Sequence, residues 1–415
     1  MMKKGLLILL CLPVIGFGQG WQYTFGGNNE SWGYSVEQTT DGGYIVAGSS
    51  DGEIYILKTD GNGVELWNQT FGGINDDVGF SIQQTNDGGF IITGKSSLGN
   101  GNYDVCLIKT DGFGIELWNQ TFALSGIDVG KSVYQTSDGG YIVTGSTHNF
   151  NGIHEVFTIK TDVSGNQQWI KNYGEGKGQS IQQTIGGGYI IIGDVKEISD
   201  SVKIYLMKTD IYGDTLWTNT FVEGEGNSIQ ETIDGGYIIT GATGGWAPDV
   251  LLIKTDSSGS EQWSQTYGGT DDDRGKSVQQ TTDGGYIVCG FTYSFGNGET
   301  DVYLIKTDAN GVEQWSQTFG GNNEDYSYSV QQTLDGGYII VGTKDANTIG
   351  NDDDIYLIKT DGNGNVTSTF NIPINPNRKL QKVVDILGKE TKPQTNTPFI
   401  EIYDDGTVEK RIVIE

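Results

Sequence analysis

Acidic side chains cluster at a few points along this chain of 415 residues. Three aspartates follow one another at Asp271, Asp272 and Asp273, and another acidic stretch contains Asp325. Carboxylate oxygens are the ligands that Ca²⁺ prefers, and six to eight oxygens complete its coordination. The run Asp271–Asp273 is therefore a candidate calcium site, although its spacing is not that of an EF-hand. The sequence points to no other cofactor.

Aromatic and histidine side chains form a second group of candidates. Aromatic rings stack on sugar faces while carboxylates accept hydrogen bonds from hydroxyl groups, and aromatic residues are also enriched in protein interfaces. We expect such residues to form a surface that binds an extracellular glycan or protein. The candidates are Trp246, Tyr293, Phe295, His148, His154 and Asp325.

Recognised catalytic motifs are missing from the sequence: it has no G-x-S-x-G elbow, no H-E-x-x-H and no P-loop. Two carboxylates can cleave a glycosidic bond, but 53 acidic residues offer no specific pair. We therefore expect a binding protein and no enzyme. A polysaccharide-degrading enzyme (glycosidase or lyase) and a purely structural surface or adhesin protein are the alternatives.

These candidates lie within a sequence repeat that occurs seven times along the chain. Each copy begins with a serine and contains a Lys-Thr-Asp tripeptide, and the copies are 46 to 53 residues apart, which is typical of β-propeller blades. The serines are Ser35, Ser81, Ser132, Ser180, Ser228, Ser277 and Ser329. The aspartates of the tripeptide are Asp60, Asp111, Asp162, Asp210, Asp256, Asp308 and Asp361.

Each copy predicts four short strands, A to D, rich in β-branched and aromatic residues. Strands A and B are joined by Asp-Gly-Gly and strands C and D by Asp-x-x-Gly, both of which are turn signals. Seven such units predict an all-β fold, a seven-bladed β-propeller of four-stranded blades. Residues 21–25 read as a strand D that would close the last blade, and residues 365–370 are the alternative closing strand.

Residues that recur in every copy are expected to be structural, because a single active site must break the symmetry. We assign this role to the glutamine pairs such as Gln83-Gln84, to the tryptophans, and to the repeated lysines, which should pair with turn aspartates. Function should lie where the copies differ, in the D-to-A and B-to-C loops. In an antiparallel blade these loops emerge together on one face.

Composition restricts the partners and the location. The net charge of −28 disfavours nucleic acid and anionic membranes. No interior run approaches the ~20 apolar residues of a membrane span. Cys106 and Cys289 are expected to be free and buried. Residues 1–18 carry Lys3 and Lys4 before an apolar stretch and resemble a cleaved signal peptide, so export is expected.

The end of the chain departs from the repeat. It contains Asp385-Ile386-Leu387-Gly388-Lys389-Glu390 and a run from Tyr403 to Glu415 with a hairpin signal at Asp405-Gly406. This segment resembles the C-terminal sorting domain of cargo of the type IX secretion system. The resemblance implies a small β domain at residues 371–415, recognition of residues 377–415 by that machinery, and a location at the outer-membrane surface or outside the cell.

The repeats also resemble quinoprotein-like propellers, whose blades carry a glycine turn followed by a docking tryptophan, as in Asp60-x-x-Gly63-x-x-x-Trp67. This resemblance concerns the fold and implies no quinone cofactor. The expected organisation is a signal peptide at 1–18, a propeller at 19–370 and a sorting segment at 371–415.

Overall fold

A computed structural model describes most of the chain. The described residues are 20–26, 30–73, 76–97, 99, 101–124, 126–149, 152–196, 201–346, 353–366, 380–385, 389–392, 399–403 and 408–411. The chain divides into two compact units, Met1–Thr367 and Ser368–Glu415. The predicted signal peptide lies outside the described residues. In the described part, no helix is long and apolar enough to cross a membrane.

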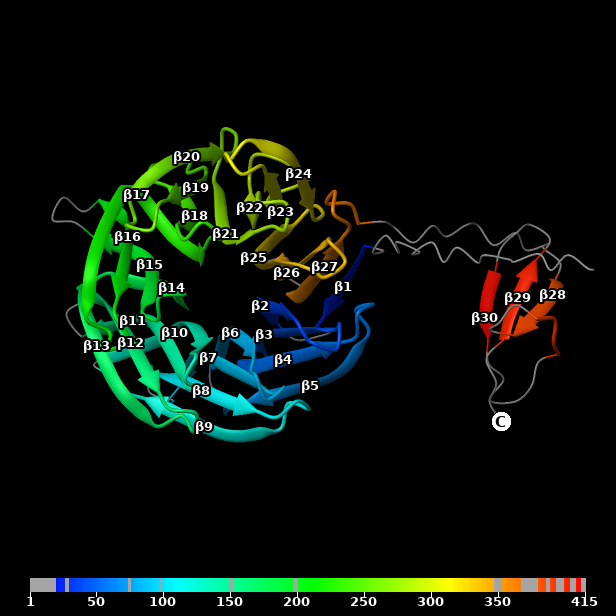
Figure 1. The fold of residues 1–415 in the computed structure, drawn as a ribbon, viewed down its shortest axis with the longest axis horizontal. Coiled ribbons are helices and arrows are strands. Elements are labelled where there is room, and N and C mark those ends of the chain that lie inside the picture. Colours follow the sequence, from blue (N-terminus) through cyan, green and yellow to red (C-terminus); the bar gives the residue numbers. More distant parts are fainter. Residues whose placement is uncertain are drawn as a thin grey trace, which may run out of the picture. The chain divides into compact units, whose positions relative to one another are not determined.

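The first unit is a seven-bladed β-propeller, and each blade is an antiparallel meander of four strands. In Figure 1 the blades follow one another around a central axis, with strands such as β2, β6 and β10 innermost and β5, β9 and β13 outermost. Blade 1 comprises β2 (Ser31–Gln38), β3 (Tyr44–Ser50), β4 (Glu53–Thr59) and β5 (Glu65–Phe71). Blade 2 comprises β6 (Val78–Gln84), β7 (Phe90–Ser97), β8 (Tyr103–Thr110) and β9 (Glu116–Phe122). Blade 3 comprises β10 (Gly126–Gln135), β11 (Tyr141–Asn149), β12 (His154–Thr161) and β13 (Gln167–Glu175).

Blades 4 and 5 share one long strand, so they form a single seven-stranded sheet. Blade 4 comprises β14 (Lys177–Gln183), β15 (Tyr189–Lys196), β16 (Val202–Thr209) and the first part of β17 (Thr215–Glu231). Blade 5 comprises the rest of β17, β18 (Tyr237–Thr243), β19 (Val250–Thr255) and β20 (Glu261–Tyr267). Blade 6 comprises β21 (Asp273–Gln280), β22 (Tyr286–Thr292), β23 (Asp301–Thr307) and β24 (Glu313–Phe319). Blade 7 comprises β25 (Glu324–Gln332), β26 (Tyr338–Ala346), β27 (Asp354–Thr360) and β1 (Trp21–Phe25).

Strand β1 closes the ring, as the first of the two sequence interpretations predicted. It pairs antiparallel with β27, from Trp21 opposite Lys359 to Phe25 opposite Ile355. The Trp21 ring meets the ring of Tyr44 in blade 1 edge-on, with centroids 5.7 Å apart. Residues 367–370, most of the rival closing strand, lie outside the described residues.

The core lies between neighbouring blades. The two middle strands of each blade are buried on both faces, and the strand-D tryptophan packs on the first aromatic residue of strand B in the next blade. The pair Trp67 and Phe90 is one case, with ring centroids 6.0 Å apart, and Trp118 and Tyr141 are another at 5.8 Å. Because burying a tryptophan removes ~150–250 Å² from water, these contacts stabilise each blade interface, and the tryptophans are structural as predicted.

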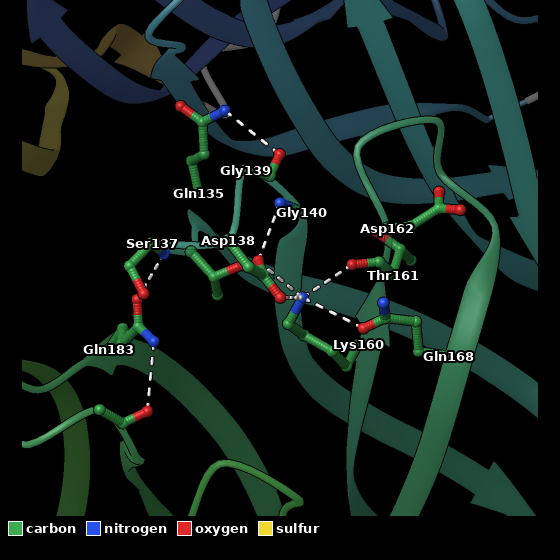
Figure 2. Close-up of polar contacts among 12 residues, drawn as sticks. Gln135, Ser137, Asp138, Gly139, Gly140, Lys160, Thr161, Asp162, Gln168 and Gln183 are labelled. Atoms are coloured by element: carbon green, nitrogen blue, oxygen red, sulfur yellow. Dashed lines mark hydrogen bonds and ion pairs between the residues drawn. The ribbon is translucent and has the colours of Figure 1, made fainter.

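The last residue of each innermost strand, a glutamine in six blades and Glu231 in blade 5, links neighbouring blades. Its side-chain oxygen accepts a hydrogen bond from a backbone N–H in the A-to-B turn of the preceding blade, at 2.7–2.9 Å (Figure 2 shows Ser137 and Gln183). The seven bonds join Thr40 to Gln84, Asn86 to Gln135, Ser137 to Gln183, Ile185 to Glu231, Ile233 to Gln280, Thr282 to Gln332 and Leu334 to Gln38. This circle closes completely, which explains why a glutamine or glutamate recurs at this position in every copy.

The repeated lysine forms an ion pair with the aspartate of the Asp-Gly-Gly turn, as predicted. In blade 3 the Nζ of Lys160 lies 2.9 Å from Oδ2 of Asp138 and also donates to the backbone carbonyl of Thr161 (Figure 2). Equivalent pairs are Lys58–Asp41, Lys109–Asp87, Lys254–Asp234, Lys306–Asp283 and Lys359–Asp335. Each pair ties the A-to-B turn to strand C.

These ion pairs predict sensitivity to acid. Partial burial alone would raise the pKa of Asp234, but hydrogen bonds from Thr232, Lys254 and the Gly236 N–H, with the Lys254 charge, lower it to about 2. An unfolded aspartate titrates near 3.9. The folded pKa is the lower one, so this contribution is complete above about pH 4 and is lost as the pH falls through about 2.

We expect the midpoint of urea unfolding to fall between about pH 5 and pH 2. Five of the six aspartate side chains are more than half exposed and that of Asp335 is 36% exposed, so each pair contributes modestly. Asp234→Asn should flatten the profile slightly. A midpoint that stays constant over this range would contradict the role given to the pairs.

The second unit contains a three-stranded antiparallel sheet of β28 (Leu380–Asp385), β29 (Phe399–Tyr403) and β30 (Val408–Arg411). Strands β29 and β30 pair on either side of the predicted Asp405-Gly406 turn, with Ile402 opposite Val408. The hairpin prediction is thus confirmed for the paired strands, while residues 404–407 lie outside the described residues. Residues 386–388 and 412–415 of the sorting-type motif also lie outside them.

Candidate functional site

The loops that join strands D to A and B to C emerge on one face, which we call the variable face. The innermost strand of each blade starts at this face and runs along the axis. A cavity of about 220 Å³ is lined by residues from the second half of the innermost strands of six blades, so it lies toward the opposite face; its lining includes Val36, Tyr134, Gln182, Gln279 and Gln331. Side chains near the start of the innermost strands surround the axis on the variable-face side, which we call the channel mouth.

A β-bulge recurs near the start of every innermost strand. In blade 1 the pairing shifts between Gly33 and Ser35, so the intervening Tyr34 has no partner in β3. A bulge re-aims the side chain of its extra residue. The seven residues at this position, which we call the bulge ring, are Tyr34, Phe80, Lys131, Gln179, Asn227, Lys276 and Tyr328.

Members of the bulge ring touch across blades. The Tyr34 ring lies 5.1 Å from the ring of Phe80 and 5.1 Å from the ring of Tyr328. The Nζ of Lys131 lies 3.6 Å from the centroid of the Phe80 ring, a cation–π contact. Four consecutive blades, 7, 1, 2 and 3, therefore present one continuous wall of three aromatic rings and a cation.

A second layer of aromatic residues extends this wall toward the variable face. Trp32 stacks near Tyr34, with ring centroids 6.4 Å apart and planes 16° apart. In blades 7 and 6, Tyr326 meets Phe291 edge-on at 4.9 Å, and its hydroxyl lies 3.2 Å from that of Tyr293. All of these rings are partly exposed, so they can contact a ligand.

Positive charge collects at the same mouth. Burial, together with the neighbouring charges of Lys95, Lys276 and Lys177, lowers the pKa of Lys131 to about 8. Because the chain as a whole carries a net charge of −28, this group of cations is a local reversal of sign. Lys131 has no carboxylate partner among the described residues, and an anion would relieve the repulsion.

A cavity of about 580 Å³ opens beside this wall, between blades 1 and 2. Trp32 and Tyr34 supply its aromatic side, and Glu30, Asp76 and Lys95 supply charged groups. Asp51, also in its lining, has a left-handed backbone (φ 52°). A few polar groups that converge on aromatic walls are typical of ligand sites.

The structure separates the aromatic residues that the sequence put forward. Tyr293 joins the channel mouth through Tyr326. Phe295 packs near Tyr303 and lines a different cavity of about 550 Å³ together with Tyr267 and Glu313. Trp246 is fully exposed in the loop between β18 and β19. Only Tyr293 of the three therefore belongs to the site described above.

His148 and His154 face each other across β11 and β12, with stacked rings 4.3 Å apart. Burial lowers the pKa of His154, and the charges of Lys177 and His148 lower it further. These effects favour the neutral form of His154. No cluster of three or more metal-ligating side chains forms around it or elsewhere in the described ranges.

Asp325 is fully buried, in contrast to the expectation that it lies on a binding surface. Its Oδ2 accepts the N–H of Gly321 at 2.7 Å and its Oδ1 accepts the N–H of Asp345 at 3.0 Å. Burial raises its pKa to about 6, although these two bonds act in the opposite direction. Asp325 therefore fixes the D-to-A loop of blade 7 by satisfying its backbone donors.

The run Asp271–Asp273 is divided between three environments, which does not fit the calcium hypothesis. Asp271 is exposed, and Asp272 forms an ion pair with Arg274 at 2.8 Å. Asp273 is buried and accepts the N–H of Gly269 at 2.8 Å and the hydroxyl of Ser294 at 2.7 Å. Because Asp273 holds its loop, replacing all three aspartates would also cost stability.

The residues that the sequence reasoning missed are those of the bulge ring. The signal was available, because the residue directly before each repeated serine varies from Tyr to Lys to Gln while its neighbours repeat. A glycine directly precedes this position in six of the seven copies, and glycine within a strand often marks a bulge. The bulge turns the variable position toward the axis.

Comparisons with known proteins give the following. No family model matches the chain, and no curated protein matches it. A protein of unknown function from Dyadobacter fermentans is similar in structure, with 10% sequence identity and a TM-score of 0.49. The match covers 81% of this chain and 97% of that chain. YCF48, solved bound to D1 peptide, is similar at 10% identity, 84% and 99% coverage and a TM-score of 0.49. Sqt1 from Chaetomium thermophilum, solved bound to the N-terminus of ribosomal protein L10, is similar at 13% identity, 94% and 98% coverage and a TM-score of 0.48.

The fold assignment depends on the chain's own strand order. Six complete meanders follow from consecutive strands, and β1 completes the seventh. The first unit of this chain is a seven-bladed β-propeller closed by its N-terminal strand.

Proposed function

We propose that this propeller is a binding protein that takes an acidic oligosaccharide at the channel mouth on its variable face. The observation that carries the proposal is the bulge ring, where Phe80 contacts both Tyr34 and Lys131 across three blades. Aromatic faces provide flat apolar contact for sugar rings, and the cations provide partners for a carboxylate.

The adjoining cavity supports a ligand of this chemistry. Glu30 and Asp76 offer oxygen acceptors for hydroxyl groups, and Trp32 offers a ring on the same wall. A volume of about 580 Å³ lies within the range of small-molecule sites. The mixture of aromatic, acidic and basic groups favours a polyhydroxylated anion over a purely apolar ligand.

The test is capture of oligosaccharides by the purified chain on an array that contains matched uronic-acid and neutral sugars. We expect retention of the acidic sugars that weakens as salt is added, because surface charge pairing is screened. Tyr34→Ala and Lys131→Met should each reduce capture roughly tenfold or more, which corresponds to about 1.4 kcal/mol.

Trp246→Ala is the matched control, since this ring is fully exposed and remote from the bulge ring in sequence and blade. It should leave sugar capture unchanged. If Trp246→Ala instead abolishes capture of a protein partner while no sugar binds, the second candidate, a protein-binding propeller, is correct. Exposed tryptophans are frequent anchors in such interfaces.

We also propose that the chain is exported and reaches the cell surface or the medium. The support is the signal-like sequence at residues 1–18 and the resemblance of the end of the chain to type IX sorting domains. The antiparallel sheet of β28, β29 and β30 is compatible with a small β domain.

Removal of residues 377–415 should keep the propeller in the periplasm of a host with type IX secretion, because the recognised segment would be lost. Cell fractionation and immunoblotting of the truncated and full chains measure this. Residues Ser368–Glu415 form a compact unit of their own, so the truncated protein should melt at the parent temperature. Normal appearance outside the cell would contradict the proposal.

A further inference from the structure

Blade 4 breaks the lysine–aspartate pattern of the other six blades. Its A-to-B turn reads Thr184-Ile185-Gly186-Gly187-Gly188, so glycine occupies the place of the aspartate. Lys208 is the repeated lysine of this blade, and within the described residues no carboxylate forms an ion pair with it. Its Nζ donates to Oγ1 of Thr184 instead.

The missing side chain leaves open space at Gly186 in the turn. A Cβ built on Gly186 would have no atom within 4 Å. The six paired lysines are buried, with only 2–3% of their surface exposed, whereas Lys208 is half-buried. In the other blades the aspartate covers the amine, so in blade 4 a small molecule can reach it from the solvent.

The charge of Lys208 is also poorly compensated. Burial lowers its pKa to about 8, and the carboxylate of Glu231 in the next blade opposes this effect only in part. A neutral amine has a free electron pair, which is the requirement for nucleophilic attack. Burial therefore adds reactivity to the access that Gly186 provides.

We propose that Lys208 is a site of selective covalent acylation, opened by the glycine that replaces the turn aspartate in blade 4. The substrate class is small acyl donors with a good leaving group, such as activated esters. The neutral Nζ attacks the carbonyl carbon, the bond to the leaving group breaks and its electron pair departs with it. The amine loses one proton to water, and an amide remains.

The experiment treats the full chain with the N-hydroxysuccinimide ester of acetic acid at about pH 7.5, where unperturbed lysines are almost wholly charged. Peptide mass spectrometry follows each lysine, with exposed Lys382 as the reference for reagent activity. Lys208 should react at least ~10-fold faster than the paired lysines such as Lys254, because its neutral fraction at this pH is larger.

Two exchanges between blades 4 and 5 test the cause. Gly186→Asp should restore the ion pair and slow Lys208 to the rate of Lys254, while the rate of Lys131, whose pKa is also lowered, stays unchanged. Asp234→Gly should open the equivalent gap in blade 5 and speed Lys254. Equal rates for Lys208 and Lys254 in the parent, or an unchanged Lys208 rate in Gly186→Asp, would overturn the proposal.

Discussion

Deleting residues 19–27 is expected to lower the melting temperature of the propeller by on the order of 10 °C or to cause aggregation. The deletion removes β1, and with it the fourth strand of blade 7. It exposes the edge of β27 and the pocket that Trp21 fills against Tyr44. Loss of a packed tryptophan alone costs about 3–5 kcal/mol.

Thermal unfolding followed by circular dichroism measures this, with light scattering to detect association. Trp21→Ala should reproduce most of the loss in a chain of full length. Tyr23→Ala is the matched control on the same strand, because Tyr23 is 45% exposed. If the deletion variant melts like the parent, β1 does not close the ring and residues 365–370 must do so.

Repetition made the architecture predictable from the sequence. Seven copies of one sequence repeat defined the blades. The strand at Trp21, which has no strands A to C before it, identified how the ring closes. The pairing of Lys160 with Asp138 was also foreseeable, since both residues recur and opposite charges that recur together are expected to meet. Because a residue that recurs in the sequence makes the same contact in each blade, an interpretation of one blade applied to the others.

The site was less predictable because it depends on irregular features. The bulge before Ser35 decides that Tyr34 faces Phe80 and Tyr328, and the only sequence signal for it is the glycine that recurs before this position. Acidity was misleading for a different reason. Asp273 and Asp325 look like ligands in the sequence, but buried backbone N–H groups need acceptors, and these carboxylates supply them.

Three consecutive glycines in blade 4 allow a sharp test of what the turns require. Gly187 has a left-handed backbone, with φ at +91°, and a Cβ there would make only ordinary contact with Ile211. Gly188 needs no positive φ, but a Cβ there would overlap the carbonyl oxygen of Thr209. Gly186 has neither restriction, since a Cβ there would meet open space.

Substitution of each glycine by alanine should therefore give three different free energies of unfolding. Gly186→Ala should be neutral or slightly stabilising, by up to about 1 kcal/mol, because it restricts the unfolded chain. Gly187→Ala should cost about 1–2 kcal/mol of backbone strain. Gly188→Ala should cost about 3 kcal/mol or more, at the upper end of overpacking, because the obstacle is backbone and cannot rotate away.

Urea unfolding of the three variants measures the series, and the pair Gly235→Ala and Gly236→Ala in blade 5 repeats it where the lysine–aspartate pair is intact. Gly235 again has a positive φ of +81° with open space, and a Cβ on Gly236 would overlap the carbonyl oxygen of Thr255. The same order in both blades would show that Gly187 and Gly235 are required for their positive φ. It would also show that Gly188 and Gly236 are required because the backbone of strand C passes too close for a side chain. Equal losses of unfolding free energy at Gly187 and Gly188 would show that the turn relaxes, and that one structural requirement, and not two, explains the repeated glycines.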